Sequence, residues 1–134
     1  MEIASFDDLL KVARAQPDPQ RLLFVFAGVQ LPEDCTPEQR VRFEAGEGGS
    51  LAPVMCVDKS LSELTDFSDL VDESSAMGVE WRIAFVAALS GTAGCMPSSQ
   101  DARKPLQHMV EAVRQGTFEG YIPFDRTGIP LRFG

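Results

Sequence analysis

The sequence has few of the residues on which catalytic and metal sites most often depend. Its 134 residues include one histidine and three cysteines. Cys35, Cys56 and Cys95 are widely spaced and form no C-x-x-C pair, so the ligand spacing of a zinc site is absent and no metal is expected. An odd number of unpaired thiols is typical of a reducing compartment, so we expect a cytoplasmic protein.

The usual motifs of nucleophilic catalysis and phosphate binding are also absent. The chain has no G-x-S-x-G elbow, no P-loop and no G-x-G-x-x-G fingerprint. The single histidine, His108, lies one position off the apolar stripe of a predicted helix, where a half-exposed surface side chain is expected rather than a general base. These absences favour a protein that is not an enzyme and that needs no cofactor.

Long hydrophobic runs and positive charge are scarce. No apolar run approaches the roughly 20 residues that cross a membrane, and the acidic N-terminal stretch lacks the features of a secretory signal. The 12 basic residues are outnumbered by 20 acidic ones, for a net charge of −8. This charge repels phosphate backbones, so neither a membrane nor a nucleic acid is an expected partner.

Two short, continuous apolar segments are present instead. Residues 83–89 lie between Gly78 and Gly91, and residues 21–28 form a similar run that ends at Gly28. Their length and their β-branched and aromatic residues are typical of strands covered on both faces. We therefore predict that residues 81–89 and 21–28 are the two central strands of a sheet.

The segments around these runs have helical spacing or strand character. Helices are predicted over residues 6–15, over two turns from Pro37, over 61–76 with 67–68 as the place for a break, and over 102–113 before Gly116. Residues 51–58 are predicted to be the second strand in chain order, between the other two, and Pro53 assigns it to an edge because proline donates no ladder hydrogen bond. Residues 121–133 are predicted to form a hairpin that turns at 125–128.

Alternation of strands and helices indicates a single α/β domain over residues 1–134. We expect three layers around a mainly parallel mixed sheet of about five strands, with the order 2-1-3-4-5 and a C-terminal antiparallel hairpin. The first and third strands would then be parallel neighbours. Their carboxyl ends would form a crevice at a topological switch point, the favoured place for a ligand in such sheets.

This crevice defines the predicted ligand-binding residues. They are small residues after the two central strands and at the cap of the third helix, namely Gly28, Ser90, Gly91, Thr92, Gly94 and Ser60. Their backbone amides and hydroxyl groups suit a small anionic ligand. The alternative is that residues 90–99 are only a flexible connector. Among the thiols, Cys56 is expected to be a small buried residue, and Cys95 is the candidate for redox reactivity.

Four segments carry a resemblance that extends over the full chain: residues 21–28 (RLLFVFAG), 43–49 (FEAGEGG), 55–59 (MCVDK) and 85–91 (FVAALSG). The chain resembles a family of short proteobacterial proteins of unknown function, whose members often carry the label "ribonucleotide reductase subunit alpha". Catalytic subunits of that reductase are several times longer, have a ten-stranded barrel, and use a radical cysteine with a separate redox pair. None of these features can be matched to residues here, so the resemblance implies no functional residues.

Three functional hypotheses remain. The first is a non-enzymatic protein-interaction or adaptor module that binds a protein partner or forms a homodimer. The second is a small-molecule or nucleotide-binding protein that uses the predicted crevice. The third is a thiol redox role through Cys95.

Overall fold

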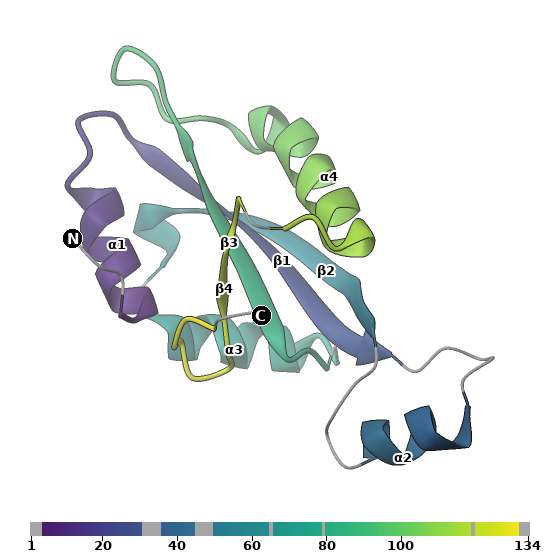
Figure 1. The fold of residues 1–134 in the computed structure, drawn as a ribbon. Coiled ribbons are helices and arrows are strands. Elements are labelled where there is room, and N and C mark those ends of the chain that lie inside the picture. Colours follow the sequence, from purple (N-terminus) through teal and green to yellow (C-terminus); the bar gives the residue numbers. More distant parts are fainter. Residues whose placement is uncertain are drawn as a thin grey trace.

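A computed structural model describes residues 4–30, 36–44, 50–64, 66–78, 80–118 and 120–131. Its elements alternate between helix and strand along much of the chain (Figure 1). In chain order they are α1 (Phe6–Arg14), β1 (Gln20–Gln30), α2 (Pro37–Glu44), β2 (Ser50–Ser60), the 3₁₀ helix η1 (Leu61–Glu63), α3 (Phe67–Ala76), β3 (Ile83–Ser90), α4 (Ser99–Gln115) and β4 (Ile122–Phe124). The broad α/β class is therefore confirmed. The predicted third helix is divided into η1 and α3, with the break before residue 67.

The sheet has four strands in the order β2-β1-β3-β4, and every neighbouring pair is antiparallel. The expected mainly parallel sheet of five strands is therefore wrong, although β1 and β3 are neighbours as predicted. The cause is the connection between β1 and β2. Helix α2 does not cross a face of the sheet, so the chain returns at the end of the sheet that it left (Figure 1).

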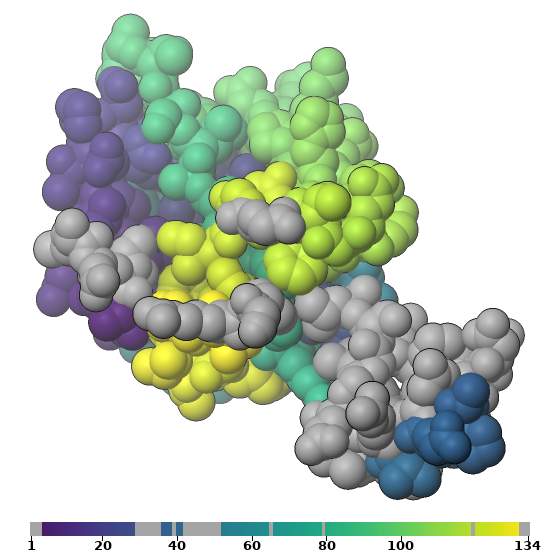
Figure 2. All heavy atoms as spheres, in the orientation of Figure 1, coloured from purple at the N-terminus to yellow at the C-terminus, as the bar shows by residue number. Residues whose placement is uncertain are grey.

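Helix α2 lies away from the sheet, and its sequence is mostly polar (Figure 1). Its described side chains are exposed, including Val41. A crossover helix between parallel strands needs an apolar stripe that covers the sheet. Figure 2 accordingly shows the blue atoms of α2 at the periphery of the molecule, away from α1 and α4. Helix α3 is the crossover instead, and it joins β2 to β3, which run in the same direction on either side of β1.

Both faces of β1 are covered. The side chains of β1 between Leu22 and Ala27 are each at most 2% exposed. Alternate residues of β1 face an aromatic cluster under α1 and α3, with ring centroids 4.9–6.3 Å apart. The cluster consists of Phe6, Phe24, Phe26, Phe67, Trp81 and Phe124. The other residues of β1 pack against α4. This double burial explains the continuous apolar run of β1 and the first half of β3, Ile83 to Val86. The second half of β3 is only partly covered, and Ala88 is exposed, so the predicted burial of residues 87–89 on both faces is wrong.

The two edges of the sheet differ. Strand β2 is at an edge, as Pro53 predicted, and its register with β1 shifts between Phe26 and Ala27. Strand β4 is short, and the chain after it folds back over the turn at residues 125–128 to a bridge between Phe124 and Pro130. The predicted hairpin turn is confirmed, but the returning arm makes only this bridge in the described part of the chain. No helix among the described residues has the length and apolar character needed to cross a membrane.

Candidate functional site

The predicted crevice between the first and third strands does not exist, because these strands are antiparallel. Gln20 pairs with Ser90 at one end of the β1–β3 ladder, and Ala27 pairs with Ile83 at the other. Gly28 and Ser90 are therefore at opposite ends of the sheet, about 25 Å apart at the usual rise of a strand. Gly28 is buried beside Glu80 and Val54, and it shares no rim with the other predicted residues.

The other predicted residues do come to one rim. Strands β2 and β3 both run opposite to β1, so their final residues flank its start. Ser60 pairs with Arg21, and Ser90 pairs with Gln20. Gly91, Thr92 and Gly94 follow Ser90 in the chain. Helix η1, which Ser60 caps, begins at the same rim.

The loop after β3 is a tight turn rather than irregular chain. The amide of Cys95 donates to the carbonyl oxygen of Thr92 at 2.9 Å. Positive φ angles at both Ala93 (50°) and Gly94 (77°) are the pattern of a type I′ turn. The amide of Gly91 donates to the carbonyl oxygen of Pro19 at 2.8 Å. The amides of Gly91 and Cys95 are therefore already hydrogen-bonded to backbone carbonyl oxygens of the protein.

Polar side chains at this rim form two hydrogen-bonded sets, which we together call the rim cluster: Gln20 with Ser90, and Arg21 with Asp58, Ser60, Glu63 and Ser99. The Arg21 guanidinium donates to Asp58 at 2.6 Å and to the carbonyl oxygen of Pro97 at 2.8 Å. Ser99 donates to the same Asp58 oxygen at 2.8 Å. The cluster thereby holds the segment before α4 against the start of β1.

Charge at the rim cluster does not favour an anion. The backbone N–H of Ser60 and then its hydroxyl group donate to Glu63, and these hydrogen bonds lower the pKa of the Glu63 carboxyl. Two carboxylates, Asp58 and Glu63, thus face one guanidinium, Arg21. A net negative rim repels a phosphate or carboxylate ligand. The arrangement is suited to fastening the loops to the sheet.

The two described thiols lie apart from each other, and neither takes part in the side-chain hydrogen bonds of the rim cluster. Cys56 is exposed on β2, which corrects the expectation that it is buried; the cause is its place on an edge strand, beside an open groove between β2 and α4. Cys95 is exposed after the turn that follows β3. Cys35 lies outside the described residues. Within the described ranges no three side chains of histidine, cysteine or acidic type gather as a metal site would require, and His108 is exposed on α4.

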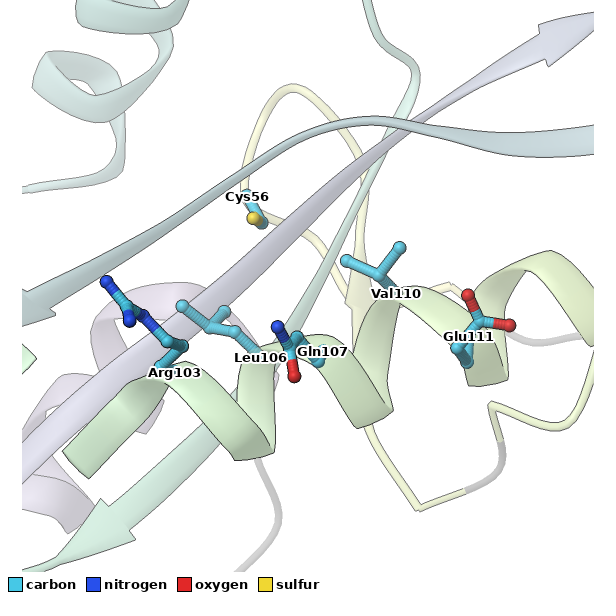
Figure 3. A pocket seen from close by; sticks show the side chains of 6 residues that line it. All are labelled: Cys56, Arg103, Leu106, Gln107, Val110 and Glu111. Carbon is cyan, nitrogen blue, oxygen red and sulfur yellow. The ribbon is translucent and has the colours of Figure 1, made fainter. Parts of the chain in front are cut away.

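A groove beside β2 was not predicted from the sequence. It is an open hollow of about 550 Å³ between α4 and β2, lined by Cys56, Arg103, Leu106, Gln107, Val110 and Glu111 (Figure 3). We call it the α4–β2 groove. Its α4 side chains recur at intervals of three and four residues, so they follow one side of the helix. The one sequence signal for this groove is Pro53, which indicates that its strand lies at an edge of the sheet. A helix that packs over an edge strand has one side that the sheet covers only in part.

The groove combines an apolar floor with charged ends. Leu106 is buried and Val110 half-buried, whereas Arg103, Gln107 and Glu111 are exposed. Cys56 lies across from these helical side chains (Figure 3). An apolar strip with opposite charges at its two ends suits contact with another polypeptide.

Comparison of the chain with protein-family models, with curated proteins and with solved structures found no match.

Proposed function

We propose that the protein is a non-enzymatic interaction module that binds another polypeptide along the outer edge of β2 and in the adjoining α4–β2 groove. The observation that carries this proposal is the place of β2 in the sheet. It is an 11-residue strand at the end of the order β2-β1-β3-β4, and no described strand pairs with its outer side. The N–H and C=O groups on that side are a template for an added strand.

The contrast with the other edge supports this choice. Strand β4 has three residues, and the amide of Leu131 donates to the carbonyl oxygen of Pro123 at 2.9 Å. The returning chain therefore covers the outer side of β4. On β2, only Pro53 and the register shift beside it hinder pairing with a further strand. After this shift, around Cys56, β2 pairs with β1 in a regular register. The α4–β2 groove opens beside the same residue.

The two exposed cysteines allow a matched test. Cys56→Lys places a long cation at the proposed surface, whereas Cys95→Lys makes the same change at an exposed site after β3. Each tagged chain is used to capture proteins from a lysate of the source cells, followed by mass spectrometry. We expect a specific partner, or further copies of the chain, to be retained by wild type and by Cys95→Lys and to be lost from Cys56→Lys.

Equal retention by the two lysine variants would contradict the proposal, because binding would then not depend on the β2 surface. Circular dichroism of both variants excludes unfolding as the cause of a loss. Both substituted side chains are exposed, so each variant is expected to keep wild-type stability to within about 0.5 kcal/mol.

A further inference from the structure

We infer that the polypeptide that occupies the β2 edge is a second copy of this chain, so that the protein is a two-fold symmetric dimer. This inference rests on the proposed function and names its partner. In the dimer β2 pairs antiparallel with β2 of the other copy. The two four-stranded sheets then become one continuous sheet, and the two α4–β2 grooves face each other across the axis.

A two-fold axis perpendicular to the sheet makes any strand that it relates antiparallel to its own copy, so β2 needs no second motif as a partner. Helix α4 packs over both β1 and β2 on one face of the sheet. The same axis therefore brings the two α4 helices alongside each other in opposite directions. The side of α4 that borders the groove is the side that meets the other helix.

The charges on that side of α4 are self-complementary. Arg103 and Glu111 each lie four residues from Gln107, which is about 6 Å along a helix. If the axis passes near Gln107, Arg103 of each copy lies opposite Glu111 of the other, and the two glutamines meet at the centre. Arg103 has no ion-pair partner among the described residues, and Glu111 has only Arg114 of its own helix, at an exposed position. Both charges are thus available to another molecule.

Cys56 lines the groove together with Gln107, so Cys56 should also lie close to the two-fold axis. A cross-link between the two copies of Cys56 would therefore report where the axis passes. Directly opposed residues of antiparallel strands have Cα atoms about 4.5–5.5 Å apart, which is within the range that a disulfide bridges. The two copies of Cys56 should therefore be close enough to join. Val110, which is half-buried, would at the same time be covered by the other copy's groove side chains, which removes its remaining apolar surface from water.

The first test is the mass in solution. Size-exclusion chromatography with light scattering should give twice the 14.6 kDa mass of the chain. Arg103→Glu and Glu111→Arg should each raise the dissociation constant about tenfold or more, because each places like charges opposite each other twice in the interface. The double variant Arg103→Glu/Glu111→Arg should restore the wild-type constant. A merely structural effect of either substitution would not be reversed by the second one.

The second test is disulfide formation with diamide as the oxidant. Cys35→Ser/Cys95→Ser retains only Cys56 and should give a covalent dimer on a non-reducing gel. Cys35→Ser/Cys56→Ser retains only Cys95 and should remain a single chain. The exposure of both thiols makes the second variant a matched control.

A monomer at every accessible concentration would overturn the inference, and the capture comparison of Cys56→Lys with Cys95→Lys would still decide the proposed function separately. A dimer that Arg103→Glu does not weaken and that Cys56 does not cross-link would also overturn it, because the two copies would then meet at another surface. Both tests use the full chain.

Discussion

The indole N–H of Trp81 donates a 2.7 Å hydrogen bond to the hydroxyl group of Ser74, and that hydroxyl donates at 2.7 Å to the carbonyl oxygen of Val71. Both Trp81 and Ser74 are 2% exposed. The ring contacts Phe26 and Phe67, and the Arg126 guanidinium lies 4.7 Å from its centroid on an exposed side chain. Ser74 is therefore the polar point at which α3 is joined to the aromatic cluster.

The substitution Ser74→Ala should lower the free energy of unfolding by about 1–3 kcal/mol, because it leaves the buried indole N–H without its partner. Urea unfolding followed by the fluorescence of the single tryptophan measures this directly. Ser68→Ala, at an exposed position of the same helix, is the control and should change stability by less than about 0.5 kcal/mol. Similar values for the two variants would show that the hydrogen bond contributes nothing.

Arg21→Ala should lower the free energy of unfolding by about 2 kcal/mol, because the side chains of Arg21 and Asp58 are only 12% and 19% exposed and Asp58 would lose its charged partner. The comparison is Arg114→Ala, which breaks an ion pair whose side chains are 61% and 54% exposed. Its loss should be at most about 0.5 kcal/mol. Denaturant titration of both variants checks the difference, and a larger loss for Arg114→Ala would refute this account of the rim cluster.

The turn at residues 125–128 should make stability depend on pH. Burial raises the pKa of Asp125, but hydrogen bonds from the Thr127 hydroxyl, the Ile129 amide and other turn donors together lower it below the ordinary value of 3.8. Because the pKa in the folded chain lies below that in the unfolded chain, the stabilisation is present above pH 3.8 and is lost as the pH falls through the folded value.

Asp125→Asn tests this dependence, because it removes the charge and keeps the shape. The free energy of unfolding of the variant should fall less steeply than that of wild type as the pH drops from neutrality through the acid range. Urea unfolding at a series of pH values provides the measurement. Parallel pH profiles for the two proteins would show that Asp125 does not contribute.

Gly91→Ala should destabilise the turn after β3 by about 1–3 kcal/mol or prevent it from forming, because steric overlap forces the backbone apart. A methyl group at this position would lie 1.9 Å from the carbonyl oxygen of Cys95 and 3.2 Å from that of Pro19. Gly120→Ala is the control, since the space beside Gly120 is open. Thermal unfolding should separate the two variants, and an unchanged melting temperature for Gly91→Ala would contradict the close approach.

Local signals in the sequence were good guides to the elements and their ends. Ser5 accepts a hydrogen bond from the amide of Asp8 at the start of α1, and Gly116 ends α4 in the left-handed conformation. Pro53 correctly assigned β2 to an edge. Each of these signals depends on a side chain and the backbone within a few residues of it, so the sequence nearby contains the information.

The candidate site could not be predicted in the same way. Cys56 and Gln107 line one groove although α3 and β3 lie between them in the chain. No periodicity within α4 or β2 indicates that they meet. The five predicted ligand residues that do lie at one rim were assigned there for the wrong reason, since β2 and β3 share a direction only because β1 lies antiparallel between them.

The sequence by itself determined that residues 21–28 and 83–89 form strands, because short continuous apolar segments favour strands with covered faces; β1 is buried from Leu22 to Gly28 and β3 from Ile83 to Val86. Only the tertiary structure decided their relative direction. An apolar run has the same pattern of burial whether its neighbour is parallel or antiparallel, and the outcome depended on where the polar helix α2 could lie. That decision removed the predicted crevice and left the edge of β2 as the open surface of the sheet.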